Sequence, residues 1–291
     1  MSFRTIMITK ESKLSLRRNH MIVKGEQMSQ VPLNEMLCLV IEHPNVSMTG
    51  HLINALSDNK IITLLCNQKH LPHSFLLPVY GHHRQARRIQ QQMNWKKIYK
   101  DTLWQEITRI KILNQKNVLE AVGHKAQAQQ FLNYAKDVTL GDATNREGHA
   151  AKVYFNLILE DGFHRGYDNA QNAALDYGYQ VLLAIVSRTI VSKGFLTEIG
   201  IKHANEFNVY NLGSDFMEIL RPLVDYTVLK HVESEFGKDE KRAILNLLNR
   251  KLKIGSKRYY LVNAVEIYID SLLKYLSNGD IDTIKIPTWT Y

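Results

Sequence analysis

The chain has 291 residues, of which 45% are hydrophobic and 22% are charged. This composition is ordinary for a compact globular protein, and it excludes a disordered or disulfide-rich chain. Lysine and arginine outnumber aspartate and glutamate by 37 to 28, which gives a formal net charge of +9. This charge favours a polyanionic partner, nucleic acid first, but a basic enzyme without such a partner is equally compatible with it.

The two cysteines and the N-terminal segment indicate a reducing compartment. Cys38 and Cys66 lie in apolar segments without C-x-x-C spacing, so they are predicted to be buried thiols rather than zinc ligands or a redox pair. The segment MSFRTIMITKESKLSLRRNH lacks an apolar stretch followed by a cleavage site, and no uncharged apolar run reaches the roughly 18 residues of a membrane span. We therefore expect a cytoplasmic protein without a membrane segment.

Residues 1–78 are predicted to form a small β domain. Short apolar segments alternate there with turn residues, namely RTIMIT, KLSLR, HMIVKG, MSQVPL, MLCLVIE, IITLLC and HSFLLPV. One further segment, MTGHLINALSDNK at 48–60, has helical periodicity and places Thr49 at an N-cap. We expect a β-sandwich-like domain that contains one helix.

After a linker at 79–85, residues 86–291 are predicted to form a larger all-α domain. Helical periodicity and breaks at Gly, Asn and Asp outline segments at 83–99, 101–121, 125–136, 144–161, 170–192, 213–234, 239–252 and 258–277. The terminal GDIDTIKIPTWTY is expected to be an extended strap or a flexible end. The predicted fold class is therefore α+β, with the β domain preceding the helical one.

Residues 203–225 combine a histidine with closely spaced acids. Asp215, Glu218 and Asp225 fall near one face of a helix that is predicted to begin near residue 213. Adjacent carboxylates repel each other unless a cation lies between them, and His203 offers an imidazole as a third ligand. A D-x-x-E pair is more commonly a solvated helix face, so these residues alone leave both interpretations open. Pro222 predicts that the helix kinks or restarts there.

A second candidate segment, TNREGHAAKVYFNLIL, occupies residues 144–159. Thr144 and Glu147 form the S/T-x-x-E pattern of a capping box immediately before an amphipathic run. Capping by itself accounts for Glu147. The alternative is that its carboxylate projects toward a metal ion.

Basic residues gather in two places, at 81–100 around Trp95 and Tyr99, and again after residue 249. Arginine binds phosphate through two parallel hydrogen bonds and aromatic rings stack on bases, but a basic face is equally common on soluble helices. DNA contact therefore remains open on the residues alone. The predicted DNA-binding residues are Arg84, Arg87, Arg88, Lys96, Lys97, Arg250 and Lys251.

Several familiar catalytic motifs are absent from the sequence. It contains no GxxxxGK[ST], GxGxxG or HExxH motif, which argues against nucleotide-driven motors, dinucleotide enzymes and zincin proteases. The His-x-x-Arg pattern of a tyrosine recombinase is approached only by His149 and Lys152.

Three segments occur together in a characteristic order: NREGHAAKVYF (145–155), NAALDYGYQVL (172–182) and KHANEFNVYNLGSDFMEILRPLVD (202–225). In these the chain resembles the integrase subunit of CRISPR adaptation, the first-named CRISPR-associated protein (Cas one). The β-then-α layout is similar from end to end. The length of the chain and the residues of these three segments are most similar to the branch of the family that accompanies a single large effector nuclease, type II-A.

The resemblance implies that a metal ion is held by a glutamate in an E-G-x-A-A segment, a histidine, and an acid before Arg-Pro. These positions fall on Glu147, His203 and Glu218, which are the expected catalytic and metal-binding residues, with Asp215 as a supporting acid. Many relatives have aspartate where this chain has Glu218 and proline where it has Ile219. The expected cofactor is Mg²⁺ or Mn²⁺.

The resemblance also implies the reaction and the partners. The reaction is insertion of short foreign DNA fragments into a CRISPR array by attack of a 3′-hydroxyl on a phosphodiester at the repeat border. The implied partners are double-stranded DNA fragments, repeat DNA, a second copy joined through the β domain, the small second CRISPR-associated protein (Cas two), other adaptation proteins and the effector nuclease, all in a prokaryotic cytoplasm. Two alternatives stay open: a stand-alone metal-dependent DNase and a non-catalytic DNA-binding scaffold.

Overall fold

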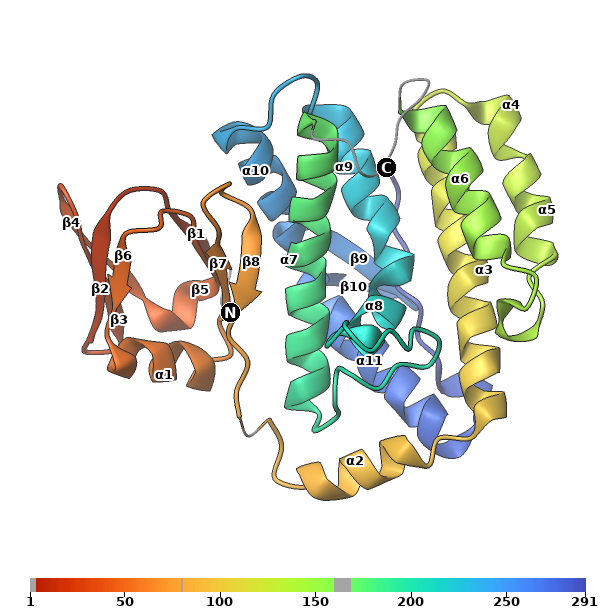
Figure 1. Ribbon diagram of the computed structural model, residues 1–291, viewed down its shortest axis with the longest axis horizontal. Helices are drawn as coiled ribbons and strands as arrows, with labels where there is room; N and C mark the ends of the chain where they lie inside the picture. The colour runs from red at the N-terminus through yellow and green to blue at the C-terminus, as the bar shows by residue number, and fades with distance from the viewer. Residues whose placement is uncertain (1–3, 80, 160–168) are drawn as a thin grey trace. The chain divides into compact units, whose positions relative to one another are not determined.

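The structure is a computed structural model that describes residues 4–79, 81–159 and 169–291. The chain divides into two compact units, Met1–Val79 and Tyr80–Tyr291. The first holds strands β1 to β8 and helix α1, whereas the second is mainly helical (Figure 1). This arrangement confirms the predicted α+β class, with a β domain before a helical domain.

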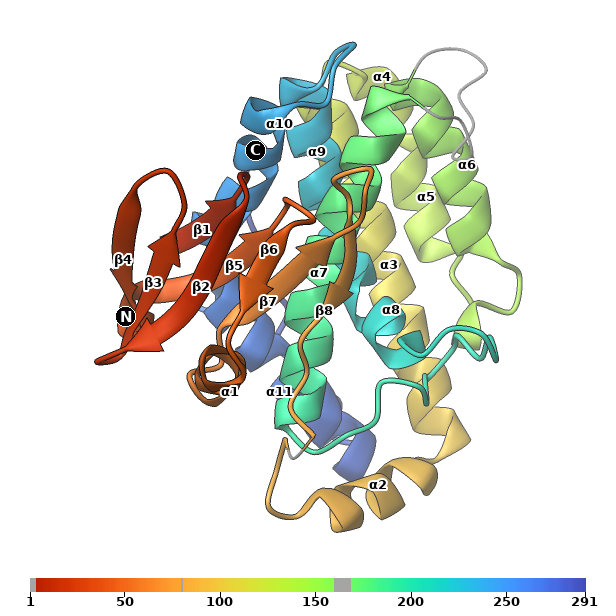
Figure 2. The ribbon, with the colours of Figure 1, turned by 60° about the vertical axis from the view of Figure 1, so that its left-hand side comes forward.

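The first unit contains two four-stranded sheets (Figure 2). One has the order β1 (Arg4–Ile8), β5 (Met36–Ile41), β7 (Ile62–Cys66), β8 (Pro72–Phe75). The other has the order β4 (Met28–Pro32), β3 (His20–Lys24), β2 (Ser12–Arg17), β6 (Val46–Met48). Strand β5 pairs in parallel with both β1 and β7, and its continuous apolar sequence MLCLVI suits a strand that is covered on both faces.

Both sheets contribute to one hydrophobic core, together with helix α1 (Gly50–Asp58). Leu14 of β2, Leu39 of β5 and Leu52 of α1 are all fully buried in it. The backbone N–H of Leu52 donates to Thr49 Oγ1 at 3.3 Å, which confirms the predicted N-cap. Each of the seven predicted strand segments overlaps an observed strand. The short strand β6 was not predicted.

The two cysteines differ in their surroundings. Cys38 is buried in the centre of β5, as predicted, but Cys66 is only half-buried. The difference arises because Cys66 ends β7, where the pairing with β8 is interrupted by a shift in register between Leu65 and Cys66.

The second unit begins with α2 (Gln85–Met93), which starts at the last residue of the predicted linker. Its further helices are α3 (Lys97–Ala121), α4 (Lys125–Ala128), α5 (Gln130–Lys136), α6 (Arg146–Ile158), α7 (Ala170–Ser192), α8 (Asn211–Met217), α9 (Arg221–His231), α10 (Lys238–Leu245) and α11 (Leu261–Asn278). Short 3₁₀ turns lie at η2 (Leu140–Asp142), η3 (Glu218–Leu220), η4 (Asn246–Asn249) and η5 (Ile281–Thr283). Among the described residues, no helix is both long enough and apolar enough to cross a membrane.

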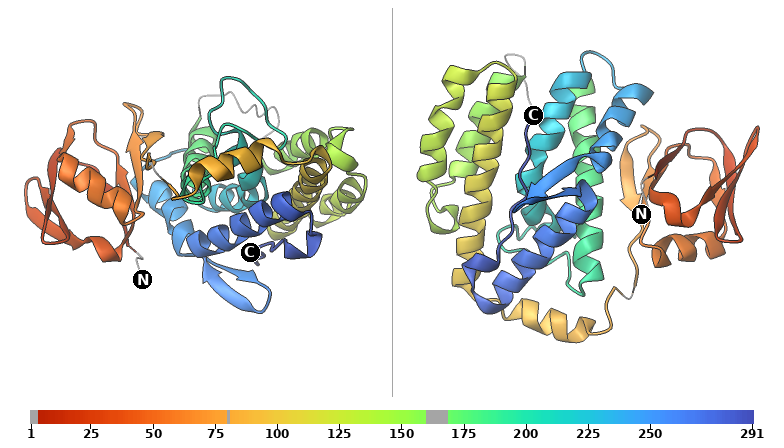
Figure 3. Two further views of the ribbon diagram at one scale, coloured as in Figure 1. Left: turned by 90° about the horizontal axis from the view of Figure 1, so that it is seen from below. Right: turned by 180° about the vertical axis from the view of Figure 1, so that it is seen from behind.

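The prediction of an all-α second domain is wrong, because strands β9 (Lys251–Ile254) and β10 (Lys257–Tyr260) form an antiparallel hairpin against α11 (Figure 3). The predicted helices 239–252 and 258–277 both run into it. Leu252 and Ile254 point inward while Lys251 and Lys253 point to solvent, which is a two-residue period. Gly255 supplies the positive φ of 60° that the turn requires.

Helix α7 runs through the second unit and packs against α8, α9, α10 and α11. Close approach to α9 depends on Gly178, since a Cβ atom there would lie 2.4 Å from Val224 Cγ1. Helices α3, α5 and α6 lie side by side (Figure 1) and share a cluster that includes Ile112, Phe131 and Tyr154. Helix α3 also contacts η3 and α9, so it joins these two parts of the unit.

The terminal segment after η5 is an extended strap rather than a flexible end. Thr288 pairs with Lys253 of β9 through two backbone hydrogen bonds of 2.8 Å. The ring of Tyr291 lies 4.5 Å from that of Tyr226 on α9. The strap therefore ties the hairpin to helix α9.

Candidate functional site

Two of the predicted acids, Glu147 and Glu218, meet at the side chain of Lys111. Lys111 lies on α3, Glu147 in the first turn of α6, and Glu218 begins η3. Lys111 Nζ lies 2.5 Å from Glu218 Oε2, and it forms a second ion pair with Glu147 Oε1. Arg221, the first residue of α9, places Nε 2.8 Å from Glu218 Oε1. Segments far apart in sequence thus supply two carboxylates and two cations to one place.

The charges of this group stabilise one another in a buried setting. Burial by itself raises the pKa of Glu218, but Arg221 and Lys111 outweigh burial and lower the pKa to about 2. Burial acts on Lys111 in the opposite sense, yet Glu218 and Glu147 raise its pKa above the usual value. Both carboxylates of the pair therefore have a cation close by, and Glu218 is ionised at neutral pH.

The carboxylate of Glu147 is not used for capping. Helix α6 has Asn145 as its N-cap, and Asn145 Oδ1 accepts from the backbone N–H of Gly148 at 3.3 Å. The Asp142 carboxylate accepts from the N–H groups of Arg146 and Glu147 at 2.8 and 3.0 Å. The predicted capping box of Thr144 and Glu147 is therefore wrong: Asn145 adopts the left-handed conformation and replaces Thr144 as the cap.

His203 is held by Asp215 at the start of the segment that leads into α8. His203 Nδ1 lies 2.7 Å from Asp215 Oδ1. The same carboxylate accepts from the backbone N–H groups of Ile201, Lys202 and His203 at 2.6, 3.1 and 3.1 Å. Asp215 is fully buried, so all four contacts are shielded from solvent. Asp215 thus fixes the histidine ring and leaves its Nε2 as the free ring nitrogen.

The electrostatic surroundings of His203 connect it to Glu218. The hydrogen bond that the ring donates to Asp215 raises the pKa of His203, burial opposes this, and the charges of Asp215 and Glu218 raise the pKa further. The edge of the ring faces Trp104 of α3, with ring centroids 5.6 Å apart. The side chain remains 43% exposed, so it is accessible to a ligand from solvent.

The predicted acidic stripe of Asp215, Glu218 and Asp225 is not a solvated face, because the exposed fractions of these residues are only 0, 4 and 2%. The three acids have different partners: Asp215 binds His203, Glu218 binds Lys111 and Arg221, and Asp225 accepts from the hydroxyl of Tyr179 on α7. The helix restarts at Arg221 with Pro222 in its first turn, as one of the two predicted outcomes. Asp225 pairs with Tyr179 and is not one of the two carboxylates that meet at Lys111.

Glu147, His203 and Glu218 together offer two carboxylates and an imidazole, a donor set that suits Mn²⁺ and tolerates Mg²⁺. In the part of the chain that the structure describes, however, no three His, Cys, Asp or Glu side chains are grouped as the ligands of one metal ion. The ammonium of Lys111 lies between the two carboxylates. The two carboxylates and the imidazole are therefore ligand types that suit a divalent cation. For the ion to bind between the two carboxylates, the ammonium of Lys111 must first withdraw.

The first basic cluster lies on α2 and its approach. Arg84, Arg87, Arg88 and Gln91 line a hollow of about 420 Å³. Arg84 and Arg87 are exposed, whereas Arg88 donates to Gln91 Oε1 at 3.1 Å and lies over the ring of Phe195. The adjacent residues Lys96 and Lys97 are exposed as well, and Lys97 pairs with Asp101 at 2.5 Å.

The second basic cluster is engaged within the fold. Arg250 donates to the backbone oxygen of Thr290 at 2.6 Å and lies over the ring of Tyr291. Lys251 lies over the ring of Tyr260 across the hairpin. Arg250 therefore has a structural task in holding the terminal strap.

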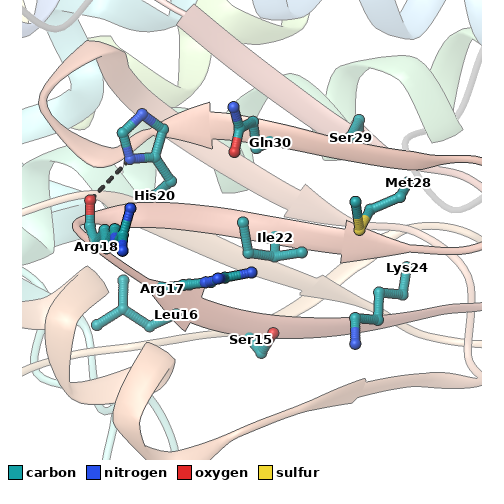
Figure 4. Close-up of a pocket in the computed structure, with 10 residues that line it drawn as sticks. All are labelled: Ser15, Leu16, Arg17, Arg18, His20, Ile22, Lys24, Met28, Ser29 and Gln30. Atoms are coloured by element: carbon teal, nitrogen blue, oxygen red, sulfur yellow. Dashed lines mark hydrogen bonds between the residues drawn. The ribbon is translucent and has the colours of Figure 1, made fainter.

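A larger hollow, of about 750 Å³, lies in the first unit against strands β2, β3 and β4 (Figure 4). Arg17, Arg18, His20 and Lys24 line it together with apolar and small polar side chains. None of its lining residues is acidic, so it does not offer the ligands that a divalent cation prefers.

The sequence analysis did not single out Lys111 or Arg221, which surround Glu218. A signal for Lys111 was available, because Trp104, Thr108, Lys111, Gln115 and Val118 form one stripe along α3 and all are buried. A lysine inside a buried stripe requires a charged partner. Its partners lie 36 and 107 residues away, which a helical pattern does not specify.

Comparison with known proteins gives a consistent result. A family model described as "CRISPR associated protein Cas1" matches residues 6–253. The "CRISPR-associated endonuclease Cas1" of Neisseria meningitidis serogroup C (strain 8013) is 33% identical over 293 residues, which cover 99% of this chain and 96% of that protein. The predicted type II-A branch stays a prediction.

Two solved structures are similar in fold. A "Casposase bound to integration product" superposes with a TM-score of 0.79 at 16% identity, covering 96% of this chain and 92% of that one. A "Cas6-RT-Cas1–Cas2 complex" superposes with a TM-score of 0.74 at 18% identity, covering 99% of this chain and 36% of that one. At these identities the likeness supports the fold alone.

Proposed function

This chain belongs to the CRISPR-associated Cas1 family of endonucleases, and on that premise we propose that it is a metal-dependent DNA integrase. It joins short foreign DNA fragments to a CRISPR repeat by attack of a 3′-hydroxyl on a phosphodiester. The observation that carries this proposal is the meeting of Glu147 and Glu218 at Lys111, close to the His203–Asp215 pair.

Glu147, Glu218 and His203 would hold Mg²⁺ or Mn²⁺. A divalent cation held there would lower the pKa of an attacking hydroxyl and would neutralise charge that develops on the phosphorus centre. The residues of the chain prepare for this in separate ways. Arg221 keeps Glu218 ionised, and Asp215 fixes the His203 ring through Nδ1, so that Nε2 is the nitrogen left to bind.

The reaction requires no protein nucleophile, since the attacking group is a hydroxyl of the DNA fragment. Tyrosines near the site are poor candidates for that role. Burial raises the pKa of Tyr268 and Tyr154 far above the usual value, and neither side chain is accessible to DNA.

We propose DNA and a second CRISPR-associated protein as partners. The net charge of +9 and the exposed arginines of α2 favour a DNA backbone. The similar structures include a casposase with an integration product and a complex whose name includes Cas2, which supports the same partners for this chain. Because two fragment ends must join two repeat borders, we also propose a homodimer held through the first unit.

The experiment that tests the proposal compares two DNA fragments that differ at one atom. Fragments with a 3′-hydroxyl or a 3′-deoxy end are incubated with the protein, Mn²⁺ and repeat DNA, and the products are separated by length. We expect joined DNA only with the 3′-hydroxyl. Cleavage of repeat DNA at the same rate with both fragments would identify a plain DNase, and binding without any product would identify a scaffold.

A further inference from the structure

The ammonium group of Lys111 lies between two carboxylates that are candidate metal ligands. This ammonium forms ion pairs with both Glu147 and Glu218 and so bridges these two acids. The Lys111 side chain is 9% exposed and that of Glu218 6%, whereas that of Glu147 is 27% exposed. A cation that is to be bound by both carboxylates must therefore enter the position that the ammonium holds.

The charges in this position are already balanced. The carboxylates of Glu147 and Glu218 face the cations of Lys111 and Arg221, so two negative charges meet two positive ones. If a divalent cation entered while Lys111 stayed, the buried group would carry two excess positive charges. Like charges in a poorly hydrated position repel strongly, so both cations cannot share it.

We propose that Lys111 competes with the divalent cation for the position between Glu147 and Glu218, and that its ammonium withdraws when the metal binds. This inference rests on the proposed function, since it takes both glutamates as metal ligands. Lys111 is then a positioning residue that keeps the two carboxylates together before the metal arrives, and it weakens metal binding by its own affinity for them.

Helix α3 offers the ammonium other acceptors. Thr108 and Gln115 share the buried face of Lys111, three residues before it and four after it. Among the described residues, neither Thr108 Oγ1 nor Gln115 Oε1 has a hydrogen-bond partner. Buried oxygens without a donor are costly, so a withdrawn ammonium would be stabilised by either of them.

Mn²⁺ binding to the full chain, measured by isothermal titration without DNA, tests the proposal independently of activity. Lys111→Met removes the competitor, and we expect Mn²⁺ to bind at least about tenfold more tightly than to the wild type. Lys111→Arg keeps the positive charge, and its planar guanidinium group can donate two parallel hydrogen bonds to a carboxylate. Mn²⁺ should therefore bind more weakly to this variant than to the wild type. If Lys111 only holds the glutamates in place, Lys111→Met will bind Mn²⁺ more weakly, which overturns the proposal.

Thermal unfolding provides a second readout. Lys111→Met leaves Glu147 without its cation and Glu218 with Arg221 alone, so it should melt below the wild type in EDTA and recover most of the difference in saturating Mn²⁺. An equal deficit under both conditions contradicts the proposal. If Lys111→Met does not fold, Lys111→Arg carries the test, and tighter binding of Mn²⁺ by that variant overturns it.

Glu147→Gln separates this inference from the proposed function. If Glu147→Gln leaves Mn²⁺ binding unchanged, then Glu147 is not a ligand, and both the metal site and the competition fail. If Glu147→Gln abolishes binding but Lys111→Met does not tighten it, the metal site stands and only the competition is wrong.

Discussion

The carboxylate of Asp215 holds His203 in two ways, through a contact with the imidazole ring and through hydrogen bonds from the backbone of residues 201–203. The imidazole Nδ1 lies 2.7 Å from Asp215 Oδ1, and the three consecutive N–H groups of residues 201–203 donate to the same carboxylate. Asp215 is fully buried, so its role is to place the histidine rather than to meet DNA or metal directly.

Asp215→Asn should lower the rate of joining by about 10- to 100-fold. The asparagine amide has one accepting oxygen where the carboxylate has two, and it lacks the negative charge that orients the His203 ring. DNA affinity should stay within about twofold, since the contact lies inside the protein. A joining assay and a filter-binding titration measure the two quantities. Asp239→Asn is the matched control, as Asp239 is exposed and, within the described part of the chain, its ion pair is with Arg242 at the surface. A normal rate for Asp215→Asn would show that the ring does not need this contact.

Gly200 is required where the backbone passes close to this contact. A Cβ atom at Gly200 would lie 2.3 Å from the His203 backbone oxygen and 2.6 Å from Asp215 Oδ2. We expect Gly200→Ala to reduce the free energy of unfolding by about 1–3 kcal/mol and to lower joining as well. Gly50→Ala serves as the control, since nothing lies within 4 Å of its added methyl group. Denaturant unfolding of both variants checks the prediction, and an unaffected Gly200→Ala would contradict it.

Asp225 makes stability depend on pH. Burial raises its pKa to about 6, against the hydrogen bond from Tyr179 and the charges of Arg221 and Lys111. The folded chain therefore holds a proton between about pH 4 and 6 that the unfolded chain releases, so this contribution to stability is present at low pH and is lost as the pH rises through 6. Its total is about 3 kcal/mol.

Asp225→Asn is neutral at every pH and should not show this loss. Unfolding free energies of the wild type and Asp225→Asn, measured from pH 4 to pH 7, should therefore differ progressively in favour of the variant as the pH rises. A difference that is independent of pH, or that moves in favour of the wild type, would show that Asp225 is ionised in the folded protein.

The two basic clusters should behave differently on substitution. Arg84 and Arg87 are exposed beside a hollow of about 420 Å³, so replacing either with alanine should weaken DNA binding and reduce the salt dependence by about one phosphate contact, without loss of stability. Arg250 holds the terminal strap through Thr290 and Tyr291, so Arg250→Ala should lower the melting temperature. Salt titrations of DNA affinity and thermal scans distinguish these outcomes. Unchanged DNA binding in the Arg84 and Arg87 variants would remove α2 from the DNA surface.

Elements with a long, unbroken pattern were predictable from the sequence. Helix α7 was predicted at its observed bounds, because its apolar residues continue from one end to the other between Asn169 and Gly194. The hairpin at 251–260 was missed because each strand is only four residues long and borders a helix, so a helical period could be drawn across it.

The candidate site was predictable in part. Glu147, His203, Asp215 and Glu218 were identified by resemblance, since the spacing of the residues alone left a solvated face as the more common outcome. Lys111 was missed because its role depends on ion pairs across 36 and 107 residues. Its helix reveals only that the position is buried, and the partners are set by the packing of α3 against α6 and η3.

The rate of Mn²⁺-dependent joining by Glu147→Ala tests the central claim most directly. Glu106→Ala is the matched control, because Glu106 is a partly exposed acid of α3 whose ion pair within the described residues is with Arg109. We predict that Glu147→Ala loses joining by at least about 100-fold while its DNA affinity stays nearly intact, and that Glu106→Ala joins normally. Undiminished joining by Glu147→Ala would contradict the assignment of this site.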